Sequence, residues 1–144
     1  RPVKRSSMLV SLVLLCAVPV AQDGGRFHGR LSVLPVDFVT LPTMSGSGKA
    51  HATLTGNTLS IEGQFEGLSS PATTAHIHQA PPALRGLVAF TIEVDETTSG
   101  EFRGTLVLID TQIQALQRSE YYVQIHTENN TDGEIRGWLM PQGE

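Results

Sequence analysis

Apolar and polar residues alternate along the middle of the chain. Residues 49–56 (KAHATLTG) alternate strictly, and residues 58–68 (TLSIEGQFEGL) place Leu59, Ile61 and Phe65 on the face opposite their polar neighbours. A period of two is typical of a strand with one buried face. The Gly-Asn pair at 56–57 favours a tight turn, so the two runs predict a β-hairpin.

The remaining periodic runs are short and are separated by turn-forming residues. They predict strands at 73–78, 87–94, 101–109, 121–127 and 134–140. Asp110 is the predicted N-cap of a short helix over 111–119. Residues 26–42 look extended but contain Pro35 and Pro42, which restrict this segment to an edge strand or an irregular crossing.

About eight short strands and one helix predict an all-β fold. The strand spacing favours an antiparallel β-sandwich or a flattened barrel with hairpin and Greek-key connections. The hydrophobic content of 40% is sufficient for a core, and the 6% aromatic content makes that core mainly aliphatic.

The first 22 residues differ from the rest. A basic flank (RPVKRSS) precedes an apolar run from Met8 to Val20, which is the layout of a secretory signal; an uncleaved membrane anchor is the alternative. We therefore expect a signal peptide at 1–22, an N-terminal strand or irregular segment at 23–45, and a domain at 46–142. Export places the protein outside the cell, or in the periplasm of a Gram-negative bacterium, with no membrane-spanning segment after signal removal.

Charge narrows the choice of partners. Removal of residues 1–22 takes away three of the ten basic residues and none of the fourteen acidic ones, which leaves a net charge of −7. Nucleic acids and anionic membranes are bound by clustered Lys and Arg, so neither is an expected partner. The single cysteine, Cys16, lies in the signal segment, so no disulfide is expected.

Histidines provide the candidate chemistry. His76 and His78 are two residues apart in a predicted strand and therefore point to the same face, and His126 lies in another strand. Three converging imidazoles suit copper or zinc and leave a coordination position open. The alternative is that these histidines are structural. The candidate fourth ligands are His51, Glu128 and Asp132, with Asp132 and Glu134 as carboxylates that would orient an imidazole.

The motif GEIRG (133–137) and its surroundings add structural candidates. Gly133 and Gly137 are expected to serve turn and close-packing geometry. Glu134 and Arg136 are expected to share a face and to pair with each other or across the sheet, and the alternative is that Arg136 orients the His126 loop or meets an acidic partner. Asn129 begins an N-glycosylation acceptor pattern. The chain contains no motif of a nucleophile elbow, a phosphate loop or a zinc protease, so the sequence does not predict an enzyme.

Five motifs in order resemble the CHRD domain family, which is named for repeats in the extracellular protein chordin. They are Gly67-Leu68, AHIH at 75–78, GLV at 86–88, YVQIHT at 122–127 and GEIRG at 133–137. The resemblance implies an extracellular, Ig-like β-sandwich, and does not imply one activity. A looser similarity to the architecture of copper/zinc superoxide dismutase depends on the His-x-His pair and is an analogy.

Three functions follow as hypotheses. The first is a secreted module that binds an extracellular protein or glycan. The second is a copper or zinc protein that uses His76, His78 and His126 for storage, delivery or redox chemistry. The third is a scaffold that assembles through exposed edge strands.

Overall fold

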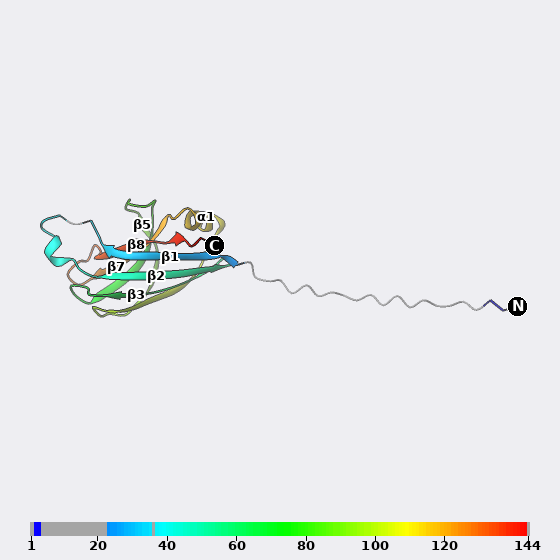
Figure 1. Ribbon diagram of the computed structural model, residues 1–144, viewed down its shortest axis with the longest axis horizontal. Coiled ribbons are helices and arrows are strands. Elements are labelled where there is room, and N and C mark those ends of the chain that lie inside the picture. Colours follow the sequence, from blue (N-terminus) through cyan, green and yellow to red (C-terminus); the bar gives the residue numbers. More distant parts are fainter. Residues whose placement is uncertain (1, 4–22, 36, 144) are drawn as a thin grey trace.

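The computed structural model describes residues 2–3, 23–35 and 37–143, and the predicted signal peptide lies almost wholly outside them. Nine strands, one α-helix and one 3-10 turn (η1) follow each other in this part of the chain (Figure 1). In chain order they are β1 (Asp23–Val33), η1 (Leu41–Thr43), β2 (Ser47–Thr55), β3 (Thr58–Glu66), β4 (Ala72–Gln79), β5 (Leu87–Val94), β6 (Gly100–Val107), α1 (Asp110–Gln117), β7 (Tyr121–Thr127), β8 (Ile135–Trp138) and β9 (Met140–Pro141). Among the described residues, no helix is long and apolar enough to cross a membrane.

The strands form a closed antiparallel barrel. Their order is β2-β3-β6-β5-β4-β7-β8-β1, and β1 pairs again with β2 to complete the ring. The all-β antiparallel fold with one short helix is thus confirmed, whereas the sandwich is corrected to an eight-stranded barrel. The physical reason is the length of β1, which pairs with β2 on one side and with β8 and β9 on the other.

The connections include Greek keys. The segment β4-β5-β6 forms consecutive neighbours, and β3 lies beside β6 rather than beside β4. The chain likewise passes from β6 to β7 across the barrel and returns beside β4. This is the expected connectivity, in which a strand from a distant part of the chain closes each set of hairpins.

The N-terminal strand departs from its prediction as an edge strand. β1 has neighbours on both sides and its Phe27 and Leu31 are buried. Pro35 and Pro42 follow the end of β1, so every residue of the strand keeps a backbone N–H for pairing. The two prolines therefore end the strand and do not weaken it.

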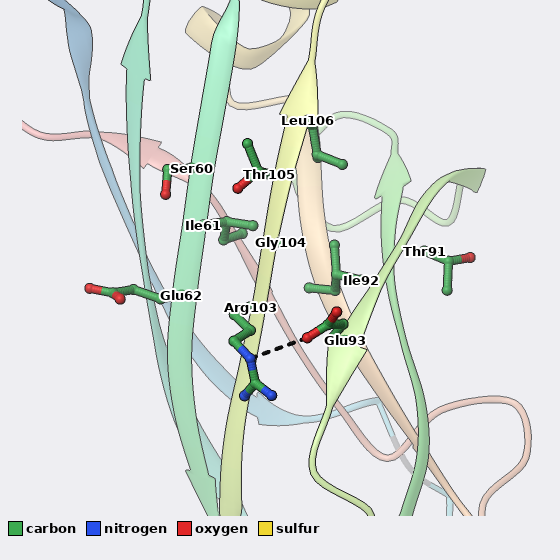
Figure 2. A pocket seen from close by; sticks show the side chains of 10 residues that line it. All are labelled: Ser60, Ile61, Glu62, Thr91, Ile92, Glu93, Arg103, Gly104, Thr105 and Leu106. Atoms are coloured by element: carbon green, nitrogen blue, oxygen red, sulfur yellow. Dashed lines mark ion pairs between the residues drawn. The ribbon is translucent and has the colours of Figure 1, made fainter.

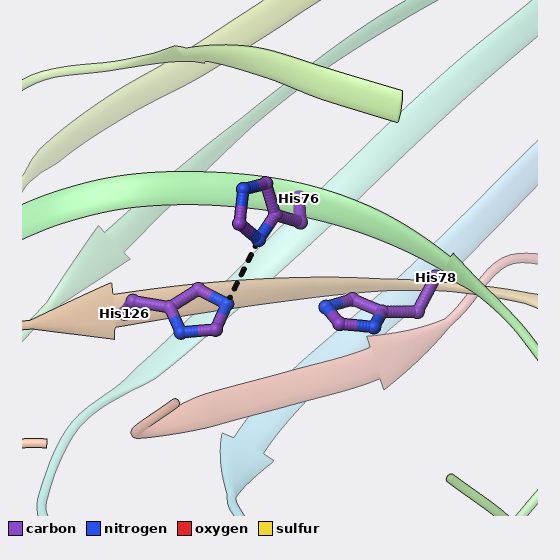
Figure 3. Close-up of side chains that lie close together, drawn as sticks. All are labelled: His76, His78 and His126. Carbon is purple, nitrogen blue, oxygen red and sulfur yellow. Dashed lines mark hydrogen bonds between the residues drawn. The ribbon is translucent and has the colours of Figure 1, made fainter. Parts of the chain in front are cut away.

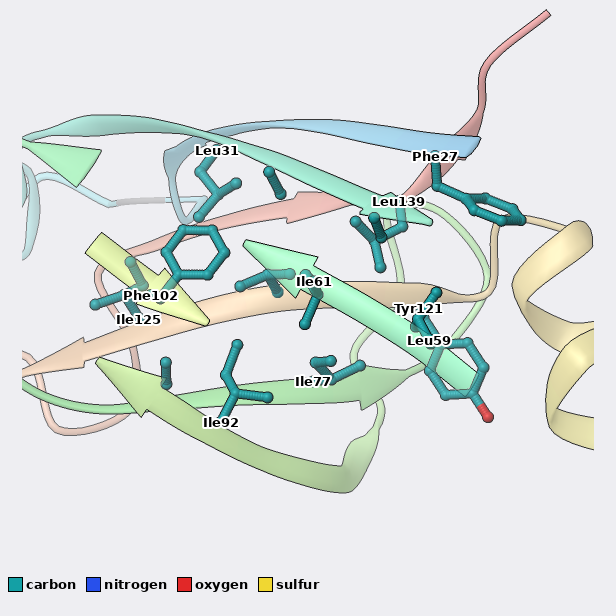
Figure 4. Close-up of a cluster of buried hydrophobic side chains, with 14 of the residues drawn as sticks. Phe27, Leu31, Leu59, Ile61, Ile77, Ile92, Phe102, Tyr121, Ile125 and Leu139 are labelled. Atoms are coloured by element: carbon teal, nitrogen blue, oxygen red, sulfur yellow. The ribbon is translucent and has the colours of Figure 1, made fainter. Parts of the chain in front are cut away.

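The core fills the inside of the barrel with side chains from alternate strand positions (Figure 4). On β3, Leu59, Ile61 and Phe65 point inward, as the alternation predicts. Helix α1 lies at one end of the barrel and buries Leu116 against it. The helix begins one residue earlier than predicted, because Ile109 and not Asp110 is the N-cap residue.

The pairing between β5 and β6 is short. Only Glu93 and Val94 of β5 pair with β6, and beyond them the two strands diverge around a cavity of about 480 Å³ (Figure 2). An ion pair between Arg103 and Glu93 (3.2 Å) lies at the end of this opening. The other neighbouring strands pair around the ring, and the scaffold hypothesis, which needs free strand edges, stays a prediction.

A substitution of Gly137 tests the close packing of β8 against β1. A Cβ at this position would lie 2.3 Å from the carbonyl oxygen of Arg30 in β1, so Gly137→Ala must push β8 away from β1. We expect the free energy of unfolding to fall by about 1–3 kcal/mol, measured by urea denaturation. Gly143→Ala is the control, because a Cβ there meets nothing within 4 Å. Equal stabilities of the two variants would contradict the account.

Candidate functional site

Three imidazoles converge on the outer surface of the barrel. His76 and His78 come from β4 and His126 comes from β7, and their rings point toward one another (Figure 3). One ring nitrogen of each histidine lies within 4.8 Å of those of the other two. His76 Nδ1 and His126 Nε2 are 3.1 Å apart. Among the described residues, these three form the group of His, Cys, Asp and Glu side chains that is close enough to hold a metal ion.

The pairing of β4 with β7 creates this arrangement. Thr74 lies opposite His126, and His78 lies opposite Tyr122, so His76 is the diagonal neighbour of His126. The intervening Ala75 and Ile77 point into the core. The period of two on both strands therefore places all three imidazoles on one face.

Backbone carbonyls orient two of the rings. The Nδ1–H of His78 donates to the carbonyl of Gly86 (3.0 Å), and that of His126 donates to the carbonyl of Thr131 (2.8 Å). A carbonyl oxygen only accepts, so each Nδ1 is protonated and the lone pair of each ring is on Nε2. The Nε2 of His126 faces His76 Nδ1, whereas the Nε2 of His78 has no hydrogen-bond partner among the described residues. A neutral imidazole binds a metal through such a lone pair.

The environment of His76 and His78 disfavours their charged forms. Burial lowers the pKa of His76, and the neighbouring His126 and His78 lower it further. Burial likewise lowers the pKa of His78, and the charges of His126 and Arg136 act in the same direction, although the hydrogen bond to Gly86 opposes them. His76 and His78 are therefore available as neutral ligands at physiological pH.

An aromatic stack borders the histidines. The ring of His78 is parallel to that of Tyr122 at 4.8 Å, and Tyr122 contacts Trp138 at 4.7 Å. The guanidinium of Arg136 lies over both rings, 5.5 Å from the centre of Tyr122 and 4.8 Å from that of Trp138. The Trp138 Nε1–H donates to the carbonyl of Ala80.

Two further members of this surface, Tyr122 and Gln124, were not predicted as site residues from the sequence. Tyr122 and Gln124 share the outer face of β7 with His126, and the Nε2 of Gln124 lies 3.3 Å from the Nε2 of His126 and donates to the carbonyl of Asp132 (3.0 Å). The signal was the alternation in YYVQIHT, which places these three side chains on one side of the strand.

The candidate fourth ligands lie outside the group of three. His51 is exposed on β2, opposite His28 and Glu62. Glu128 and Asp132 are exposed in the β7–β8 turn, and Asp132 contributes its backbone carbonyl to Gln124. Asn129, the glycosylation candidate, is exposed in the same turn, and its modification stays a prediction.

Glu134 and Arg136 do not form the expected ion pair. Glu134 is fully buried before the start of β8, where its carboxylate accepts hydrogen bonds from Ser69 and from Asn130 Nδ2. Arg136 instead lies on the outer face, over Tyr122 and Trp138. The bend at Glu134 interrupts the strand geometry that would have placed both side chains on one face.

The two glycines of GEIRG lie where a side chain would meet neighbouring atoms. Gly133 has φ +113°, and a Cβ there would lie 2.5 Å from Gln124 Nε2, so the residue allows the turn and leaves room for the amide beside His126. Gly137 allows the close approach of β8 to β1.

The fold and the site define an all-β barrel with a histidine cluster on its outer face. A family model that describes the CHRD domain matches residues 32–139, which is most of the chain. The chain therefore belongs to the CHRD domain family. No curated protein and no solved structure matches it.

The lowered pKa values of two histidines predict that the stability of the metal-free protein depends on pH. Because the pKa values of His76 and His78 are lowered on folding, the unfolded chain binds more protons, and stability falls as pH decreases from about 6.5 toward the folded pKa values. We expect a smaller decrease between pH 7.5 and 5.5 in His76→Gln than in wild type, measured by urea denaturation with a chelator present. His51→Gln is the exposed control, and a full wild-type decrease in His76→Gln would contradict this account.

The buried hydrogen bonds of Glu134 predict an effect on stability that does not involve the histidines. Glu134→Ala removes the acceptor for the backbone N–H of Ser69 and for Asn130, and leaves buried donors unpaired. We expect a loss of about 2–3 kcal/mol in the free energy of unfolding, measured by urea denaturation. Glu128→Ala, an exposed carboxylate of the same turn, should change stability by less than about 0.5 kcal/mol. A similar small effect of Glu134→Ala would show that the buried network is dispensable.

Proposed function

We propose that this CHRD domain binds a copper or zinc ion through His76, His78 and His126. The observation that supports it best is the buried Nε2 of His78, which has no hydrogen-bond partner among the described residues. A buried lone pair without a partner is costly unless a ligand uses it. This atom belongs to the same group in which the nitrogens of His76 and His126 already lie 3.1 Å apart.

The nitrogen–nitrogen separations in the histidine cluster are close to those of a tetrahedral metal site. Zinc binds imidazole nitrogen at about 2.0–2.1 Å, so two ligands of a tetrahedral site lie about 3.4 Å apart. The His76–His126 pair, at 3.1 Å, is slightly shorter than this value and must widen, and the separations of up to 4.8 Å must shorten. His76 would move its proton from Nδ1 to Nε2, because its Nδ1 faces His126 in the free protein.

The ligand chemistry favours an accessible site over a closed structural one. Three imidazoles without cysteine suit copper or zinc, and they leave one coordination position for an external ligand. His76 and His126 are partly exposed, so an ion has a route of entry. Delivery, storage or redox use are all compatible with such a site in an exported domain.

Metal loading tests the proposal directly. We expect the purified domain to bind close to one equivalent of copper or zinc, measured by elemental analysis after gel filtration. His76→Ala and His126→Ala should each lower the affinity at least about 100-fold, since loss of even a group behind the ligands costs 10–100-fold in known sites. Trp138 is the only tryptophan and contacts Tyr122, so its fluorescence should report copper binding by quenching.

His51→Ala is the matched control, because this histidine is exposed on β2. Its metal affinity should equal that of wild type. Metal content far below one equivalent in wild type, or equal affinities in all four proteins, would reject the metal site. The domain would then remain an extracellular binding module of the CHRD family whose partner contacts other surfaces.

A further inference from the structure

Arg136 is a buried cation without a counter-charge. Its side chain is 8% exposed, its Nη1 has no hydrogen-bond partner, and no ion pair involves it within the described part of the chain. Its described contacts are with the faces of Tyr122 and Trp138. Removal of a guanidinium from water costs several kcal/mol, and cation–π contacts return only part of that cost.

This cation belongs to the same surface as the histidines. Arg136 lies opposite Gln124 in the β7–β8 ladder, and Gln124 lies opposite His76 in the β4–β7 ladder. Arg136 and His78 also both lie against the ring of Tyr122.

A divalent ion would add to this uncompensated charge. The three ligands are neutral imidazoles, and the group contains no carboxylate. Glu134, the nearest acidic residue in sequence, is committed to Ser69 and Asn130. Two further positive charges beside Arg136 therefore need an anion from outside the chain.

We propose that the site binds its divalent ion together with a small anion, such as a halide or a carboxylate, which occupies the open coordination position and balances Arg136. This inference rests on the proposed metal site. The anion binds reversibly as a fourth ligand, and no bond within the protein is formed or broken. A partner molecule with an exposed carboxylate would meet the same requirement.

Azide titration of the copper(II)-loaded protein measures the anion site, because azide bound to copper(II) produces a charge-transfer absorption band. We expect Arg136→Gln to weaken azide binding about tenfold, as the loss of one nearby positive charge predicts. Arg136→Lys keeps the charge and should retain most of the affinity. Arg103→Gln is the control, since Arg103 is exposed on β6 and paired with Glu93.

Zinc affinity provides a second measurement. A variant that only lost packing would not bind zinc more tightly, so an increase in affinity would be due to the removed charge. At constant ionic strength, wild type should bind zinc more tightly in chloride than in perchlorate, which coordinates poorly. In perchlorate, Arg136→Gln should bind zinc more tightly than wild type, because the repulsive charge is gone. Thermal unfolding of the free proteins identifies any variant that fails to fold, and Arg136→Lys then supplies the comparison.

The outcomes separate the two proposals. Metal binding with equal azide affinities in wild type and Arg136→Gln, and with no difference between chloride and perchlorate, would overturn the anion inference and leave the metal site in place. Absence of copper and zinc binding in wild type would overturn the metal site and the anion inference together.

Discussion

The register between β4 and β7 is the constraint on which the rest of the site depends. It places His78 opposite Tyr122 and Thr74 opposite His126, so that residues far apart in the chain share one outer face. A slip of one residue would turn the imidazoles into the core and Ile77 outward, at the cost of buried apolar area. The same pairing that fills the barrel therefore holds the histidine cluster together.

Backbone groups, and not carboxylates, orient the cluster. The carbonyls of Gly86 and Thr131 come from the loops that follow β4 and β7, and each receives one imidazole N–H. Side-chain orientation thus depends on loops that are themselves anchored, since Gly86 N–H donates to the Tyr122 hydroxyl. The group of three contains no carboxylate, and the guanidinium of Arg136 lies against the same Tyr122 ring as His78.

Local patterning predicted the elements well, and failed where contacts are non-local. The boundaries of β5 and β7 match the predicted 87–94 and 121–127. β1 was expected to be an edge strand because of its prolines, yet both lie beyond the end of the strand. Barrel closure through β1 has no local signature, because it requires pairing with β2 and with β8 across the whole chain. The expected pair of Glu134 with Arg136 failed because a bend, invisible in the alternation, precedes β8.

The sequence by itself determined the all-β class and the placement of His76 and His78 on one face, because both follow from the period of a strand. It also determined where close packing is possible, because glycine has no side chain. Tertiary structure alone decided that His126 meets them, that Arg136 is buried beside the cluster without a counter-charge, and that Glu134 is used elsewhere. Those outcomes depend on strand order and register, which arise from contacts between residues about fifty or more positions apart and which no local pattern specifies.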